Sequence, residues 1–108
     1  DKFRTKLIGD DSGKLLETPV LCSFITSPAV NRTFAKFLFS DKSITEKMTS
    51  RITKIISLAL SENTDILVLG AFGCGVFGNK RETVFRIFED AVNSFVPDNI
   101  KVIFAVPD

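Results

Sequence analysis

The chain has 108 residues, of which 44% are hydrophobic and 25% charged, and its 14 Lys and Arg nearly balance 13 Asp and Glu to leave a formal charge of +1. This length and balance predict one globular domain and exclude a disordered or fibrous chain. A charge so close to zero also argues against the basic face with which proteins hold a nucleic-acid backbone. We therefore expect no nucleic acid as a partner.

The apolar runs and the few cysteines restrict the class of protein further. No run approaches the roughly 20 apolar residues of a membrane-spanning helix, and no signal-peptide pattern opens the chain, so we expect an intracellular protein without membrane contact. Cys22 and Cys74 are too few for a disulfide framework or a structural zinc site. The chain has no His, which excludes histidine relays and imidazole-ligated metals. Neither a metal nor a cofactor is expected.

The first third of the chain predicts two strands. Residues 2–9 alternate well enough for a half-buried strand, and 10–14 supply turn residues; Asp10 and Asp11 there are explained by a solvated turn better than by a cation site. Residues 19–26 form a nearly continuous apolar run, typical of a strand buried on both faces of a parallel or mixed sheet. Pro28 ends that strand, so the following residues are expected at the carboxyl edge of the sheet, where ligands usually bind.

A helix is predicted from Ser43 to about residue 61. Ser43 and Glu46 have the spacing of a capping box, and apolar residues then recur at helical intervals at Met48, Ile52, Ile55 and Ala59. Lys47, Arg51 and Lys54 fall on the other face and are expected to face solvent. The preceding segment 32–42 fits neither a helix nor a strand. Its phenylalanines, Phe34, Phe37 and Phe39, are better explained by core packing or by contact with a missing part of the protein than by base stacking.

The last third predicts a strand, a helix and a strand. Residues 65–70 are an apolar strand, the apolar spacing of Val84, Phe88, Ala91 and Phe95 predicts a helix, and 101–106 are a second strand after a turn. Strands separated by helices imply right-handed crossovers and a largely parallel sheet. The fold class is therefore α/β, and we expect about four strands in one sheet.

The most informative segment is GAFGCGVFGN at 70–79, which holds four of the six glycines between a predicted strand and a predicted helix. Glycine lets the backbone adopt positive φ and approach a ligand closely. Unpaired amides at the start of a helix attract anions. This pattern predicts a site for a phosphate or diphosphate.

Three other interpretations of this loop can be weighed from its spacing. The pattern GxxxxGK[ST] is absent, which excludes a nucleoside-triphosphatase loop. Gly73, Gly75 and Gly78 satisfy GxGxxG, but a dinucleotide fold needs an acid about 20 residues further on, and Asp108 lies too far along the chain. In the third interpretation the loop is a structural turn whose glycines permit close packing of strand and helix.

The order of segments resembles one known family. FITSPAVN, a long helix ending in LALSEN, LVLGAFGCGVFGN with its helix, and VIFAV together resemble the microbial-type poly(ADP-ribose) glycohydrolases. The resemblance implies that residues 1–108 are the C-terminal part of a single macrodomain-like domain, with a mixed, mostly parallel sheet flanked by helices. It implies ADP-ribose or poly(ADP-ribose) as the ligand.

The resemblance also implies which residues bind that ligand. In the family the loop wraps the diphosphate through backbone amides, and its aromatic residue lies against a ribose. Here the loop residues are Gly73, Cys74, Gly75, Val76, Phe77, Gly78 and Asn79. Ser27, Pro28, Ala29 and Asn31 more loosely resemble the strand-end motif that borders the same cleft. Cys74 would then be a small loop residue, because no His is present to generate its thiolate.

The sequence departs from the family at the catalytic motif. The glutamate that cleaves the ribose–ribose bond lies in a GGG then QEE motif, which occurs nowhere in this chain, and none of Glu46, Glu82, Glu89 and Asp90 is expected to replace it. No catalytic residue is therefore assigned, and this chain alone is expected to be inactive. We expect the catalytic segment upstream of residue 1, and this missing half, or a second copy, to cover an exposed sheet edge. A non-catalytic ADP-ribose-binding module is the alternative.

Overall fold

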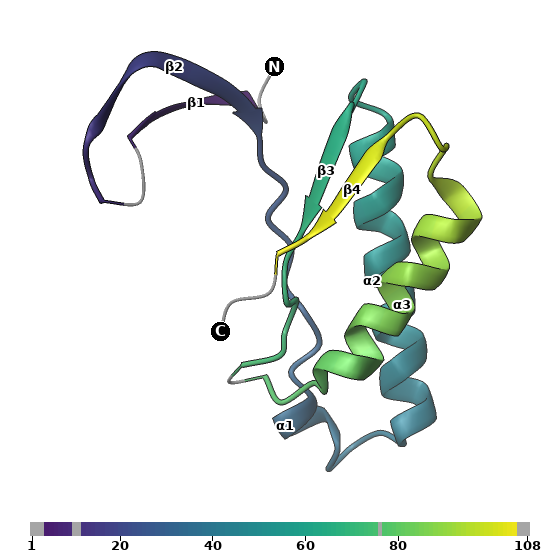
Figure 1. Ribbon diagram of the computed structural model, residues 1–108. Coiled ribbons are helices and arrows are strands. Elements are labelled where there is room, and N and C mark those ends of the chain that lie inside the picture. The colour runs from purple at the N-terminus through teal and green to yellow at the C-terminus, as the bar shows by residue number, and fades with distance from the viewer. Residues whose placement is uncertain (1–3, 10–11, 76, 106–108) are drawn as a thin grey trace.

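The computed structural model describes residues 4–9, 12–75 and 77–105, and it has the mixed α/β character that the sequence predicts. Figure 1 shows the elements in chain order. They are β1 (Arg4–Gly9), β2 (Leu15–Ser23), α1 (Arg32–Ala35), α2 (Asp41–Leu60), β3 (Ile66–Leu69), α3 (Arg81–Phe95) and β4 (Lys101–Phe104).

The β3–α3–β4 unit forms the parallel crossover that the sequence predicts. β3 and β4 are parallel neighbours, with Leu67 opposite Val102. Both α2 and α3 lie on one side of this pair (Figure 1). Along β3, Leu67 and Leu69 are buried while Ile66 and Val68 are exposed, because successive side chains of a strand point to opposite faces. One face of the pair therefore packs against the helices, and the other is open.

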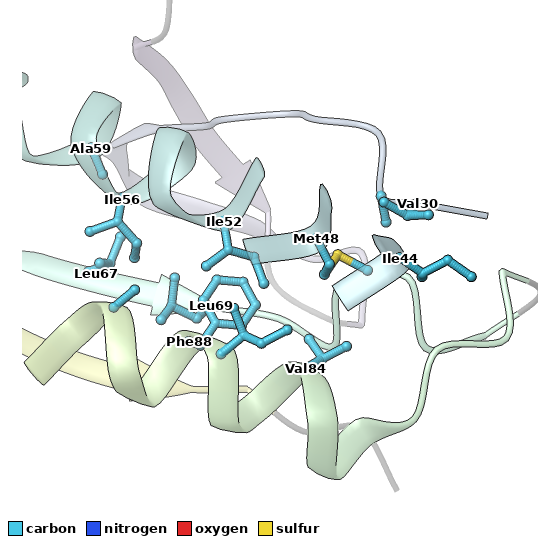
Figure 2. Packing of buried hydrophobic residues seen from close by; sticks show 13 residues of the cluster. Val30, Ile44, Met48, Ile52, Ile56, Ala59, Leu67, Leu69, Val84 and Phe88 are labelled. Carbon is cyan, nitrogen blue, oxygen red and sulfur yellow. The ribbon is translucent and has the colours of Figure 1, made fainter. Parts of the chain in front are cut away.

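The core lies between the helices and the covered face of the sheet, as Figure 2 shows. On α2, Met48, Ile52 and Ala59 are buried as predicted, but Ile56 is buried where Ile55 was expected. On α3 the predicted Phe95 is more than half exposed, since it lies in the last turn of the helix. The buried hydrophobic residues are Ala29, Val30, Ile44, Met48, Ile52, Ile56, Ala59, Leu67, Leu69, Val84, Ile87, Phe88 and Ala91.

The start of α2 corrects the predicted capping box. Ser40 is the N-cap, with extended backbone (φ −70°, ψ 160°), and its side chain accepts a hydrogen bond from the Ser43 amide at 3.2 Å. Ser43 is thus inside the first turn, and the Ser43–Glu46 capping box was a wrong prediction. Ser40, three residues earlier, caps the helix instead, and Asp41 in the first turn complements the helix dipole.

The N-terminal strands form a separate hairpin, so the predicted single four-stranded sheet is not present among the described residues. β1 and β2 pair antiparallel, and the turn between them contains Gly13 at φ 85°. Val20 and Leu21 are more than half exposed, so β2 is not buried on both faces as predicted, because no helix covers it (Figure 1). The radius of gyration is 15.6 Å, against about 13 Å for a compact domain of this length.

None of the helices in the described part of the chain is both long and apolar enough to cross a membrane.

Candidate functional site

The glycine-rich loop, residues 70–80, connects β3 to α3 at the carboxyl edge of the parallel strands, beside α1 (Figure 1). The predicted order of strand, glycine loop and helix is therefore confirmed. The Ala105 amide donates to the Leu69 carbonyl at 2.8 Å, so the two strand ends meet at the same edge. In α/β sheets this edge is where ligands bind.

Backbone hydrogen bonds shape the loop but leave several of its amides unpaired. The Gly78 amide donates to the Gly75 carbonyl at 3.0 Å, and the Asn79 amide donates to the Gly73 carbonyl at 3.1 Å. Within the described residues, the amides of Gly73, Gly75 and Phe77 donate to no acceptor. They precede the N-terminus of α3, whose dipole adds partial positive charge. The loop therefore offers donors suited to an anion.

The glycines of the loop fall into two classes. Gly73 (φ 71°) and Gly78 (φ 75°) have left-handed backbone, which side chains other than glycine rarely adopt. A Cβ on Gly73 would lie 2.5 Å from the Ala29 Cβ, and one on Gly78 would lie 2.5 Å from the Thr33 Oγ1. A Cβ on Gly75 would meet nothing within 4 Å. Close packing thus accounts for Gly73 and Gly78, as the structural-turn interpretation requires, but not for Gly75.

Asn79 is buried at 9% exposure and joins the loop to the strand-end segment. Its Nδ2 donates to the Val30 carbonyl at 2.7 Å and to the Gly73 carbonyl at 2.8 Å. Two carbonyl acceptors can be satisfied only by the NH₂ side of the amide, and they use both of its hydrogens. No sequence pattern predicts this link, since Val30 and Asn79 are 49 residues apart.

The strand-end segment, residues 27–31, lies against this loop, but not at a shared sheet edge as predicted, because β2 pairs with β1 and ends at Ser23. Ala29 is buried, and Ser27 is half-buried. The Pro28 carbonyl accepts a hydrogen bond from the Arg51 Nη1 at 2.8 Å. Arg51 is half-buried, so the prediction that it faces solvent was wrong. This arginine holds the segment onto α2.

A second contact joins the loop to α1. The Asn31 side chain caps α1 by accepting from the Phe34 amide at 3.3 Å. In the same turn, the Thr33 amide donates to the Phe77 carbonyl at 3.1 Å. The loop is therefore tied to residues 30–33 at both Phe77 and Asn79.

The aromatic residues near the site are largely exposed. The ring of Phe77 is partly exposed, and Phe34, Phe37 and Phe39 all lie outside the core. The Lys47 Nζ lies 4.7 Å from the centre of the Phe39 ring, a cation–π contact that keeps this lysine on the surface. Of the two origins that the sequence left open for the phenylalanines of residues 32–42, core packing is excluded.

Cys74 is half-buried in the loop, and its Sγ lies 3.6 Å from the Phe72 carbonyl. Burial raises the pKa of its thiol, and nearby Arg81 offsets this only in part. The sulfur therefore stays protonated at neutral pH, which does not suit a nucleophile. In the described part of the chain, no three Cys, Asp or Glu side chains gather as metal ligands would.

A cavity of about 170 Å³ lies under the end of the loop, between the first turns of α2 and α3. Asn79, Lys80 and Thr83 line one side of it. On the other side Arg32 forms an ion pair with Asp41 at 2.9 Å. The arginine is thus neutralised by a carboxylate of this chain.

No sequence profile of a protein family and no curated protein matches the chain. Solved structures do match. The poly(ADP-ribose) glycohydrolase of Deinococcus radiodurans in complex with ADP-ribose is 31% identical over 95% of this chain, with a TM-score of 0.84. That of Thermomonospora curvata bound to the inhibitor ADP-HPD is 34% identical over 94%, with a TM-score of 0.79. The resemblance to microbial poly(ADP-ribose) glycohydrolases is confirmed, and the chain spans 43% and 39% of those two chains.

Proposed function

We propose that this chain is the ADP-ribose-binding part of a macrodomain-like poly(ADP-ribose) glycohydrolase, and that residues 1–108 form the C-terminal part of that domain. The observation that carries the proposal is the set of amides at Gly73, Gly75 and Phe77, which donate to no acceptor within the described residues and lie in the loop that leads into α3. Backbone amides at a helix start are the usual partners of a diphosphate. The ligand of the Deinococcus radiodurans enzyme, ADP-ribose, contains one.

In this proposal Gly75 contacts the ligand, and the closely packed Gly73 and Gly78 shape the loop. Gly75 has no neighbour where a Cβ would lie, so a diphosphate could approach its amide closely. Phe77, two residues further along the loop, has a partly exposed ring, suited to the face of a ribose. Val76 belongs to the proposed contacts but lies outside the described residues. The remaining proposed contacts are Cys74, Gly78, Ser27, Pro28, Ala29 and Asn31, whereas the side chain of Asn79, predicted from the sequence as a contact, is used within the chain.

In this proposal the chain binds the ligand, and a carboxylate outside this sequence cleaves the bond. Breaking a ribose–ribose bond through an oxocarbenium-like state needs an acid at the leaving oxygen, oriented by binding elsewhere. The sequence contains no GGG then QEE motif. We therefore propose that this chain orients the ligand and that the complete protein hydrolyses it. A binding-only module is the second candidate, and the coding sequence upstream distinguishes the two by the presence or absence of that motif.

Calorimetry with ADP-ribose, AMP and NAD tests the ligand. The complete protein should bind ADP-ribose best, since AMP lacks the second phosphate and NAD carries an additional nicotinamide on the terminal ribose. Gly75→Leu should abolish binding by filling the open position, whereas Ser57→Leu, on the exposed side of α2, serves as the matched control. Equal affinity of Gly75→Leu and the unmodified protein would refute the assignment of the loop.

We also propose that the open side of β3 and β4 is covered by the part of the domain that carries the catalytic motif. The chain exposes 7945 Å², against about 5,900 Å² for a compact monomer of its 11.9 kDa. The excess is as large as that buried in a stable protein interface. It includes apolar side chains at Ile66, Val68 and Ile103. The solved relatives are more than twice as long as the stretch they share with this chain.

Intact mass combined with light scattering tests this covering segment. We expect the chain to be found in a complex with additional polypeptide of the same protein, so that the mass in solution exceeds that of this chain. A lone, monodisperse monomer of 11.9 kDa that binds no upstream segment added in excess would contradict it. A symmetric dimer would instead identify a second copy as the cover.

A further inference from the structure

We infer that Asn79 is a positioning residue, which holds the glycine loop in its ligand-accepting shape and does not itself contact the ligand. This inference rests on the proposed function and deepens it. Both hydrogens of the Asn79 Nδ2 are used by the Val30 and Gly73 carbonyls at 2.7 and 2.8 Å. With its side chain buried, the amide nitrogen has no donor left to offer a phosphate.

The geometry of the loop explains why it needs such a residue. The Gly73 carbonyl accepts from both the backbone amide and the side chain of Asn79, so residues 73 and 79 of the loop are held together. The unpaired amides of Gly75 and Phe77 lie within the segment that this contact closes. A loop fixed in advance loses less conformational entropy when it binds an anion.

The same side chain also fixes where the loop lies relative to the strand-end segment. The Val30 carbonyl is in a buried stretch whose neighbour, Ala29, would be 2.5 Å from a Cβ on Gly73. At the far side, the Thr33 amide binds the Phe77 carbonyl. Within the described residues, the Asn79 side chain thus joins the loop to residues 27–31 through its hydrogen bond to Val30. Its loss should free the loop while the helical core stays folded.

Hydrogen–deuterium exchange of the full chain tests this role without any ligand. Asn79→Asp keeps the size of the side chain but places carboxylate oxygen against two carbonyl oxygens, and Asn79→Ala removes the donor. Both should speed exchange of a peptide covering 70–79 by about tenfold or more, with exchange in the middle of α2 unchanged. Asn93→Asp, on the exposed side of α3, is the matched control and should alter neither peptide.

Calorimetry with ADP-ribose on the same variants completes the test. Affinity should fall about tenfold or more together with the faster exchange. Unchanged loop exchange in both variants would overturn the inference, and weaker binding with unchanged exchange would show that Asn79 contacts the ligand itself. If Asn79→Asp does not fold, Asn79→Ser carries both measurements. Failure of the unmodified protein to bind ADP-ribose would refute the proposed function, while the exchange rates would still decide the role of Asn79.

Discussion

The two faces of the β3–β4 sheet differ sharply in solvent exposure, although every residue of β3 is apolar. In the sequence ILVL, Leu67 and Leu69 are 8% and 4% exposed, whereas Ile66 and Val68 are 57% and 60% exposed. A continuous apolar run is typical of a strand that is buried on both faces. The helices of this chain complete one face and leave the other open. The apolar side chains of the open face, Ile66 and Val68, are those that the proposed covering segment would contact.

The largest expected effect separates the two faces directly. Ile52→Ala opens a cavity in the closed layer, because Ile52 is fully buried beneath β3 and α3 (Figure 2), and should cost about 2–5 kcal/mol of unfolding free energy. Val68→Ala, on the open face, should cost less than about 1 kcal/mol. Urea denaturation of both variants measures the difference. Similar losses would show that the open face is covered in the protein as purified.

The glycine loop offers the same contrast between a closed and an open side. Gly73→Ala places a Cβ against Ala29 and strains a backbone at φ 71°, so we expect a loss of about 1–3 kcal/mol. Gly75→Ala meets nothing within 4 Å and should change stability by less than about 0.5 kcal/mol. Thermal or urea unfolding checks the pair. A Gly75→Ala variant as unstable as Gly73→Ala would contradict the two-class assignment.

The sequence predicted well where an element is defined by neighbours along the chain. The two long helices and the order of strand, glycine loop and helix are local patterns and are confirmed, although one predicted core position in each helix, Ile55 and Phe95, was wrong. The turn at Gly13 is also local, but whether β2 joins the parallel strands depends on contacts far along the chain. Periodicity does not report such contacts, so the predicted single sheet was wrong.

The candidate site divides in the same way. Glycine spacing located the loop, because positive φ angles and a close approach of the backbone to a ligand favour glycine. It could not separate Gly73 from Gly75, since the difference is the distance to Ala29, a residue more than 40 positions earlier. Nor could it reveal that Arg51 holds Pro28 or that Asn79 holds Val30. Those polar contacts depend on how the strand-end segment packs against the helices.

A smaller effect is expected at the contact that holds the strand-end segment to the closed layer. Arg51→Ala removes the hydrogen bond to the Pro28 carbonyl and should cost about 1 kcal/mol. Lys54→Ala, one turn further and exposed, is the matched control and should be nearly neutral. Urea denaturation measures both. Equal effects of the two substitutions would mean that the Arg51 contact adds nothing beyond a surface charge.

The smallest effect is expected at Cys74, which lies between the closed and open sides of the loop. Desolvation raises the pKa of its thiol, so the reactive thiolate forms only above the usual pH range of a cysteine. Alkylation by iodoacetamide should therefore be slow at pH 7 and rise steeply as the pH increases past 9. In a Cys22→Ser background, mass spectrometry follows this single thiol, and unfolding in urea supplies the unshifted reference.

Because the folded state retains the proton more tightly, this group's small contribution to stability is present at neutral pH and is lost as the pH rises through the folded pKa. Rapid alkylation of the folded chain at pH 7 would instead identify an activated thiolate and reopen the case for a nucleophile in the loop.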